Sequence, residues 1–168
     1  AEGGLQWPCP DEDHPGSPLL HERLWRRPID GKPAPFSCVE HSPPVDILDK
    51  EFPLRLTTGR VLDSYNTGVQ TEKYSSPIRT GETLDISKSD AKLLGIVSGE
   101  HVQVTSRRGT IKMTINIDPD LPTGLAFTTF HFSESTDVNQ LTNDAWDPKS
   151  GTAEFKATAI KIEKIINA

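Results

Sequence analysis

Residues 82–118, ETLDISKSDAKLLGIVSGEHVQVTSRRGTIKMTINID, carry the pattern that decides the fold. The first six residues predict a β-strand, and a short helix follows with Ser87 as its N-cap, Asp90 in the capping-box position and Gly95 at its C-terminal end. Beyond the helix, apolar residues alternate with polar ones on both sides of a turn at 107–109. The alternating apolar residues are Val102, Val104, Ile111, Met113, Ile115 and Ile117. Their spacing of two predicts a β-hairpin with one buried face.

Three further segments have the character of strands: FPLRLTT at 52–58, LAFTTFHF at 125–132 and FKATAIKIEKI at 155–165. Six strands with one or two short helices predict a mainly β fold in the form of a closed or nearly closed barrel. By contrast, residues 1–50 hold nine of the 14 prolines, which interrupt both helices and sheets. The predicted organisation is an irregular proline-rich arm over 1–50 and a barrel domain over 51–168.

The proline-rich arm contains large apolar side chains that are unusual in a solvated linker. They are Trp7, Leu19, Leu20, Leu24, Trp25 and Phe36. A disordered tail and an arm that lies over another surface, in this domain or in a longer chain, are both open interpretations. The apolar content favours the second.

Charge and cysteine content limit the classes of function. A formal net charge of −6 over 168 residues weighs against a nucleic acid held by a broad basic face. Cys9 and Cys38 form no CxxC pattern and are expected to be unpaired thiols. The sequence has no apolar run near the roughly 20 residues of a membrane span and no signal-peptide pattern, so we expect a cytoplasmic protein. It begins AEGG without an initiator methionine, which indicates a piece of a longer protein.

Two long polar segments, at about 59–80 and 131–154, each leave the end of a predicted strand. Both are rich in Asn, Thr, Ser and Asp, and connections of this length in a compact domain are usually either functional or disordered. The first begins within TTGRVLDSYNTGVQT, residues 57–71. A merely solvated loop is the simpler interpretation of any one residue, but two such loops at one end of a barrel favour ligand binding.

The side chains of these loops suit a polar ligand that carries phosphate. Gly59 and Gly68 allow backbone N–H groups to approach a ligand closely. Arg60 can bind phosphate through two parallel hydrogen bonds, and Lys156 supplies a point charge at the far end of the second loop. The candidates for reading the edges of a heterocycle are Ser64, Asn66, Thr67 and Asn139.

The sequence lacks the motifs of several self-contained active sites, namely GxGxxG, GxxxxGK[ST], HExxH and GxSxG. The histidines show no metal-ligand spacing, and the DEDH run at 11–14, beside prolines, is interpreted as a solvated turn. We therefore expect neither a catalytic residue nor a metal ligand within this chain.

Four segments, in the same order, resemble a known family. TGRVLDSYNTGVQT resembles the TGR…NTG loop in the carboxy-terminal domain of bis-molybdopterin guanine dinucleotide oxidoreductases. LDISKSDAKLLGIVSGEHVQVTSRRGTI is similar to the central helix and hairpin of that domain, and FTTFHFSESTDVNQLTNDAWDPKSGTAEFKATAIKIEKI is similar to its closing segment. The opening GLQWPCPDEDHPGSPLLH resembles the stretch before this domain in formate dehydrogenase catalytic subunits. The resemblance covers nearly the whole chain.

This resemblance implies a double-psi β-barrel that binds molybdopterin guanine dinucleotide. Molybdenum or tungsten and an iron–sulfur cluster would be held by other parts of the parent enzyme, whose ligands are absent from this sequence. The implied cofactor-binding residues are Thr58, Gly59, Arg60, Ser64, Tyr65, Asn66, Thr67, Gly68, His131, Asn139 and Lys156. Many nitrate-reducing members of the family have histidines where this chain has Ser64 and Asn66.

The resemblance predicts part of a formate dehydrogenase that oxidises formate to carbon dioxide and passes electrons to an iron–sulfur centre. The same domain of a nitrate reductase is one alternative, and a non-catalytic double-psi barrel that serves as an interaction module is another. The expected partners are the remaining domains of the parent catalytic subunit, with electron-transfer subunits as further candidates. The isolated piece is expected to be inactive.

Overall fold

A computed structural model describes Trp7, Cys9, 11–16, Arg26, Pro28, 31–33, 35–36, 38–61 and 79–165. The chain divides into two compact units, Ala1–Ser42 and Pro43–Ala168. The described residues of the first unit form neither helix nor strand, and Cys9 and Cys38 are not joined in a disulfide. The predicted organisation into an arm over 1–50 and a barrel domain over 51–168 stays a prediction.

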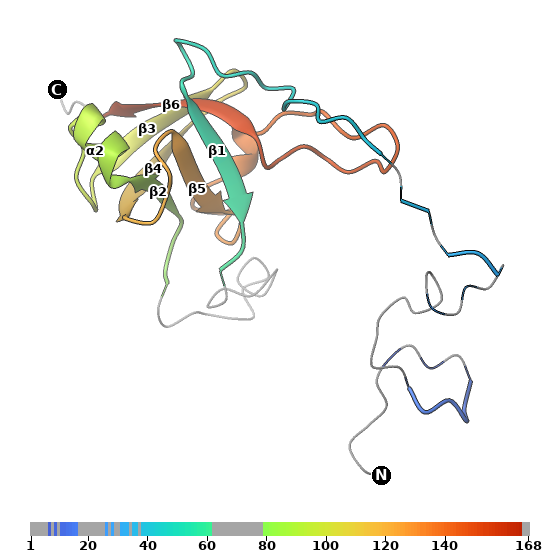
Figure 1. Cartoon of the computed structure of the whole chain (residues 1–168). Helices are drawn as coiled ribbons and strands as arrows, with labels where there is room; N and C mark the ends of the chain where they lie inside the picture. Colours follow the sequence, from blue (N-terminus) through green and yellow to red (C-terminus); the bar gives the residue numbers. More distant parts are fainter. Residues whose placement is uncertain are drawn as a thin grey trace. The chain divides into compact units, whose positions relative to one another are not determined.

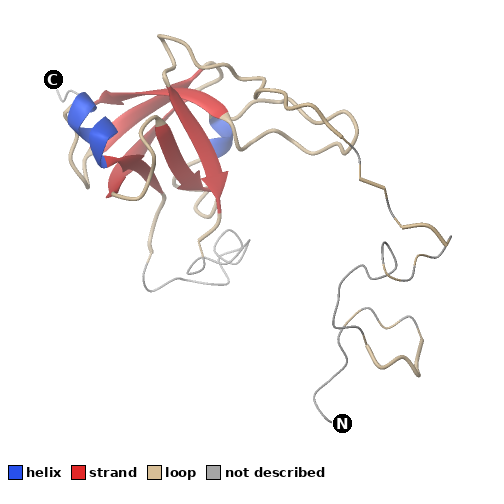
Figure 2. Ribbon diagram, viewed as in Figure 1, coloured by secondary structure: helices blue, strands red, loops and turns tan. Residues whose placement is uncertain are grey.

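The described residues of the second unit form a closed barrel of six strands with two short helical segments (Figure 1). In chain order the elements are β1 (Leu54–Gly59), β2 (Thr83–Ser87), α2 (Lys88–Leu94), β3 (His101–Ser106), β4 (Thr110–Asp118), β5 (Leu125–Thr129), the 3-10 helix η2 (Val138–Gln140) and β6 (Thr158–Lys164). In space the strands follow the order β1-β5-β2-β4-β3-β6. Figure 2 shows the strands that form the barrel in red and the helical segments in blue. The predicted mainly β, closed barrel is confirmed.

Two of the six strand pairs are parallel, which distinguishes this barrel from a simple up-and-down meander. β1 pairs with β5 and β2 pairs with β4 in the parallel sense, while the other four pairs are antiparallel. Each parallel pair needs a crossover: α2 and β3 lie between β2 and β4 in the chain, and β2 to β4 lie between β1 and β5. The two interleaved crossovers are consistent with a double-psi β-barrel.

The helix α2 follows the capping residues expected from the sequence. The Ser87 Oγ accepts a hydrogen bond from the Asp90 backbone N–H at 3.0 Å and donates one to Asp90 Oδ2 at 2.7 Å. Gly95 ends the helix in the left-handed conformation with φ of 66°. Asp90 Oδ2 also accepts from the Gly124 N–H at 2.8 Å, so the N-terminal cap of α2 fixes the turn before β5 as well.

The hairpin β3–β4 supplies the largest share of the core. Val102 lies opposite Met113 and Val104 opposite Ile111, and all four side chains are buried. They pack with buried residues of the other strands, among them Leu56, Leu84, Ile86, Ala126 and Ile160. The alternation read from the sequence therefore predicted which face of the hairpin is buried.

Several strand ends differ by a few residues from the predicted segments. Pro53 has no backbone N–H, and β1 begins only at Leu54. β5 ends at Thr129, because the N–H groups of His131 and Phe132 bond the Glu82 carboxylate instead of a neighbouring strand. These ends are set by contacts with distant residues, which period-2 patterning does not contain.

The segment before β1 is fastened to the barrel by a buried carboxylate. Asp46 is 6% exposed and accepts hydrogen bonds from Arg107 Nη1 at 2.5 Å, Arg108 Nη2 at 2.6 Å and the Ala159 N–H at 2.8 Å. Its own backbone carbonyl accepts from Arg55 Nη1 at 2.6 Å. Residues 43–50, which composition groups with the proline-rich arm, thus reach β1, β6 and the β3–β4 turn through Asp46, by its carbonyl and its side chain.

Candidate functional site

Both long polar loops leave the barrel at the same end. β1 and β5 run parallel, with Gly59 beside Thr129, and β2 begins next to them, with the Thr128 hydroxyl donating to the Thr83 carbonyl at 2.9 Å. The first loop leaves β1 and returns to β2 at this end, and the second leaves β5 there (Figure 1). We call this end the strand-end rim; it comprises 58–61, 79–83, 129–132 and 155–156.

Thr58 and Lys156 meet at the strand-end rim, as the proposed site requires. Lys156 Nζ donates to the Thr58 carbonyl at 2.8 Å, and the Thr58 hydroxyl donates to the Phe155 carbonyl at 3.0 Å. Thr58 is buried, so its side chain joins the two segments of the rim. A lysine ammonium has three donors and this bond uses one, so Lys156, an exposed residue, can also serve a ligand.

Gly59 is required by packing within the rim. A Cβ at this position would lie 2.6 Å from Phe127 Cε2 and 3.0 Å from Phe127 Cζ, closer than real Cβ atoms come. The absence of a side chain therefore lets the Phe127 ring cover the end of β1. An approach of the Gly59 backbone to a ligand stays a prediction.

We expect Gly59→Ala to lower the free energy of unfolding by about 1–3 kcal/mol, because the added methyl overpacks the Phe127 ring. Chemical denaturation measures this change. Gly81→Ala is the matched control, since nothing lies within 4 Å of a Cβ there. If Gly59→Ala/Phe127→Leu is no less stable than Phe127→Leu alone, the clash is the cause; a full loss in the double variant contradicts this account.

Arg60 and His131 follow the two strand ends. Arg60 is exposed, whereas His131 is 3% exposed and its Nε2 accepts a hydrogen bond from the Val61 N–H at 3.4 Å. The imidazole thus connects the beginning of the first loop to the beginning of the second. Its place in the rim is the predicted one, and a contact of the ring with a ligand stays a prediction.

Glu82 was not identified from the sequence, in which it is only the first residue of a predicted strand. Its side chain is fully buried beneath the rim and accepts hydrogen bonds from Thr129, His131, Phe132 and Arg79. The one signal in the sequence is Arg79 three residues earlier, and that spacing is too common to indicate a site. Its other partners lie some fifty positions away and could not be paired with it in advance.

Asn139 lies away from the rim. It is an exposed residue of η2, and its backbone N–H is capped by Asp137 Oδ1 at 3.2 Å. The next residue packs on the β3–β4 turn, where a Cβ on Gly109 would lie 2.5 Å from the Gln140 carbonyl oxygen. Ser64, Tyr65, Asn66, Thr67 and Gly68 lie outside the described residues. The structure therefore brings together Thr58, Gly59, Arg60, His131 and Lys156 among the predicted site residues.

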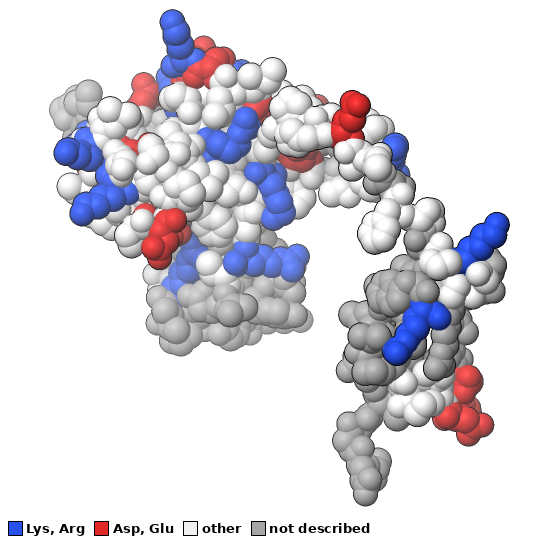
Figure 3. All heavy atoms as spheres, in the orientation of Figure 1, with Lys and Arg blue, Asp and Glu red and all other residues white. Residues whose placement is uncertain are grey.

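The donors at the rim fit a ligand that carries phosphate. Arg60 and Lys156 are exposed there, and Figure 3 shows Lys and Arg side chains at the end of the barrel where β1 ends. Arg79 is bound to the buried Glu82 at 3.2 Å, so the acidic group of the rim is covered while cations face outward. A guanidinium fork and an ammonium suit phosphate oxygens through charge-assisted hydrogen bonds.

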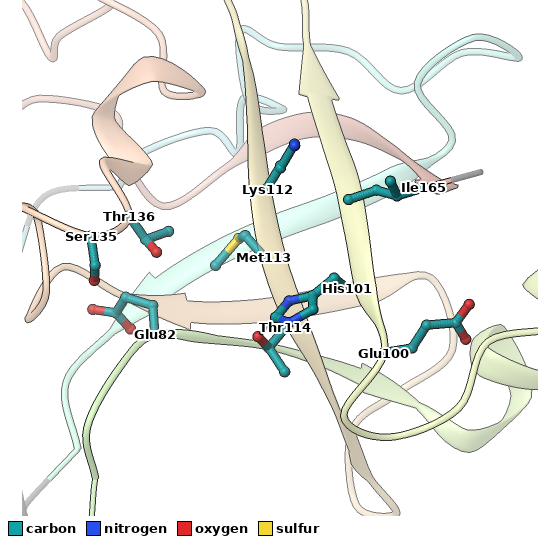
Figure 4. Close-up of a pocket in the computed structure, with 9 residues that line it drawn as sticks. All are labelled: Glu82, Glu100, His101, Lys112, Met113, Thr114, Ser135, Thr136 and Ile165. Carbon is teal, nitrogen blue, oxygen red and sulfur yellow. Dashed lines mark hydrogen bonds between the residues drawn. The ribbon is translucent and has the colours of Figure 1, made fainter. Parts of the chain in front are cut away.

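A depression of about 670 Å³ is lined by residues of β3 and β4 and extends to Glu82 of the strand-end rim (Figure 4). His101, Lys112 and Thr114 line it, with Ser135 and Thr136 from the second loop. His101 Nδ1 lies 3.1 Å from the Thr114 hydroxyl, a neighbour across the two strands. This Thr114–His101 contact is the one hydroxyl–imidazole pair among its lining residues, which are all described, and no described acid bonds the imidazole to orient it.

Glu100, at the edge of this depression, is part of a surface ion pair. The N–H of Val97 chiefly, together with Lys164, holds the pKa of the Glu100 carboxyl below its usual value, although partial burial opposes this. Within the part of the chain that the structure describes, no cluster of His, Cys, Asp or Glu could hold a metal ion. Among the same residues, no helix is both long and apolar enough to cross a bilayer.

Comparison with known proteins identifies the family. Residues 54–159 match the family described as "Molydopterin dinucleotide binding domain". The sequence is 43% identical to F420-dependent formate dehydrogenase 2 subunit alpha of Methanococcus maripaludis, over 96% of this chain and 24% of that protein. It is 33% identical to the assimilatory nitrate reductase catalytic subunit of Bacillus subtilis, over 96% of this chain and 23% of that protein. The chain thus spans about a quarter of the length of these relatives.

A solved structure shares the fold. Acetylene hydratase from Pelobacter acetylenicus superposes with a TM-score of 0.58 at 21% sequence identity, over 69% of this chain and 19% of that one. The family match covers most of the barrel, from β1 to the beginning of β6. The resemblance drawn from the loop, helix and hairpin motifs is confirmed, and the chain belongs to the molybdopterin dinucleotide-binding domain family.

Proposed function

We propose that the chain binds and orients molybdopterin guanine dinucleotide as one domain of a cytoplasmic molybdenum or tungsten formate dehydrogenase. The meeting of both loop ends at one rim, beside exposed Arg60 and Lys156, is the observation that supports this most directly. A long dinucleotide offers phosphates and heterocycle edges, and the rim and its loops contain cations, amides and hydroxyls that suit such groups.

The residues of this chain have binding and positioning roles. Arg60 binds a phosphate with two parallel hydrogen bonds, and Lys156 adds a second positive charge while it remains bound to the Thr58 carbonyl. The polar residues of the first loop, Ser64, Tyr65, Asn66, Thr67 and Gly68, bind the remaining polar edges at the rim, and His131 holds the two loops together. Asn139, on η2 beside the β3–β4 turn, binds a part of the long ligand that extends past the rim. When bound, the cofactor supplies the redox chemistry, and the domain keeps it oriented and shielded from water.

The parent enzyme oxidises formate to carbon dioxide and transfers electrons to an iron–sulfur centre held by its other domains. Formate is favoured over nitrate because identity to the formate dehydrogenase alpha subunit of M. maripaludis, 43%, exceeds identity to the B. subtilis nitrate reductase, 33%. A nitrate reductase-like parent is the second candidate, supported by that same 33% match over 96% of the chain. Family membership speaks against a non-catalytic interaction module.

The test uses the full-length protein that carries this chain. We expect it to purify with pterin and with molybdenum or tungsten, detected by pterin fluorescence after oxidation and by elemental analysis. Formate should then reduce a viologen dye, while nitrate should not reoxidise it. Nitrate-dependent dye oxidation without formate activity would establish the second candidate, and a protein with neither pterin nor metal would refute cofactor binding.

A further inference from the structure

Glu82 is a buried carboxylate to which the cofactor-binding role assigns nothing. Its side chain has no exposed surface. Oε1 accepts from the His131 N–H at 2.5 Å and the Phe132 N–H at 3.0 Å, and Oε2 accepts from the Thr129 hydroxyl at 2.5 Å and Arg79 Nη2 at 3.2 Å. Each carboxylate oxygen of Glu82 therefore accepts two hydrogen bonds.

These donors belong to both long loops. Thr129 is the last residue of β5, His131 and Phe132 begin the second loop, and Arg79 lies where the first loop returns to β2. The beginning of the first loop is one step further on, because the Val61 N–H donates to Nε2 of the same His131. One carboxylate therefore connects three loop ends that are far apart in the sequence.

Stability alone is a poor reason for a buried ion at this place. Removing a carboxylate from water is costly, and ion pairs in protein interiors often contribute little net stability compared with apolar packing. The N–H groups of His131 and Phe132 could instead have continued the β5 ladder. The chain ends β5 on a side-chain anion, and this fixes where the second loop starts relative to Arg79 and Val61.

We infer that Glu82 is a positioning residue that holds both loops in one register, so that Arg60 and the start of the second loop face the same ligand. Arg60 directly precedes Val61, so a shift of His131 displaces the guanidinium that binds phosphate. Lys156 is held independently through Thr58. This inference rests on the proposed function, since it concerns how the residues that bind the same cofactor are positioned.

Glu82→Gln tests the role with little change in shape. The amide oxygen can still accept from the two backbone N–H groups, but the amide nitrogen then faces Arg79, and two donors cannot pair. In the full-length holoprotein we expect the cofactor dissociation rate to rise about tenfold to hundredfold, the range for a lost charge-assisted hydrogen bond. Arg79→Gln should give a similar rise, and the double variant should add little to either.

Asp46→Asn is the matched control for general destabilisation. Asp46 is also a buried carboxylate bound by arginines, but its partners are Arg107 and Arg108 of the β3–β4 turn and the N–H of Ala159, which pairs with Arg55 near the beginning of β1. The Asp46→Asn substitution should lower the melting temperature at least as much as Glu82→Gln does, and it should leave the cofactor dissociation rate unchanged. Hydrogen exchange gives a second readout in which the Val61 amide of Glu82→Gln exchanges faster while core amides of β3 and β4 do not.

Two results would overturn the inference. One is a loaded Glu82→Gln protein that releases cofactor at the wild-type rate, and the other is an equal rise in Asp46→Asn. Failure of the proposed function is a different result, since the wild-type protein itself would then contain no pterin.

Discussion

Replacement of both Arg60 and Lys156 by alanine should make the full-length protein lose its cofactor during purification. Each side chain offers a charged hydrogen bond to phosphate, and removal of one such bond costs about 1.5–3 kcal/mol, or roughly 10- to 100-fold in affinity. The two side chains reach the rim from different loops, so their effects should nearly add, to about 10²- to 10⁴-fold. Pterin content per polypeptide after gel filtration measures the loss.

A charge-matched variant makes this prediction specific. Lys88→Ala/Lys149→Ala removes two exposed positive charges, one at the start of α2 and one in the outer part of the second loop. It should keep full pterin content. Retention in the wild type should also fall as salt is raised, and the Arg60/Lys156 variant should show a weaker salt dependence. A double alanine variant that stays fully loaded would exclude these two side chains as phosphate ligands.

Asp46→Asn should lower the free energy of unfolding by about 2–4 kcal/mol at neutral pH. Loss of one partner from a buried ion pair leaves the opposite charge uncompensated, which typically costs about 3–5 kcal/mol. Arg107 and Arg108 are about one-third exposed, so water compensates them in part and the expected cost is lower. Denaturant titration of the two proteins gives the difference, and a change below about 0.5 kcal/mol would show that residues 43–50 are not fastened by this side chain.

The same substitution predicts a dependence on pH. Burial raises the pKa of Asp46. Hydrogen bonds from Arg108, Ala159 and Arg107 together lower it by more than burial raises it, so the net pKa lies below the ordinary 3.8. A depressed pKa means that the stabilisation is complete above pH 3.8 and is lost as the pH falls through the folded-state pKa. The stability difference between wild type and Asp46→Asn should therefore be constant near neutrality and shrink in acid.

Asp147→Asn serves as the control for acid titration. Its pKa is also lowered, chiefly by the N–H groups of Ser150 and Lys149, but the carboxyl is exposed in the outer part of the second loop. Its replacement should change stability little at any pH. A wild-type minus Asp46→Asn difference that persists unchanged to the lowest pH would contradict the ionised pair as its source.

The sequence predicted the elements that depend on neighbouring residues. Ser87, Asp90 and Gly95 bound α2 as expected because caps act within one helical turn, and the β3–β4 hairpin follows from alternation and a tight turn. The closed strand order was expected only as a class of architecture. Which strands pair in parallel depends on contacts between distant segments, for which periodicity has no signal.

The candidate site was predictable in its exposed donors and not in what supports them. Arg60 and Lys156 could be selected as candidate phosphate ligands from their chemistry, and both are exposed at the rim. The supporting roles of Glu82 and Asp46 could not be predicted, because the sequence around a single acidic residue indicates neither its burial nor its partners. Asn139 has the right chemistry, but η2 is held beside the β3–β4 turn by Gln140 and Leu141, away from the rim.

The pairing of β1 also sets a time order for synthesis of the chain. Its two neighbours, β5 and β6, begin at Leu125 and Thr158, so β1 remains without partners until β5 and β6 have left the ribosome. Contacts between such distant segments are slow to form, because a long loop of chain must close first. The Lys156–Thr58 bond forms only with them. Cofactor loading by this rim is therefore expected only after β5 and β6 have been synthesised and have paired with β1.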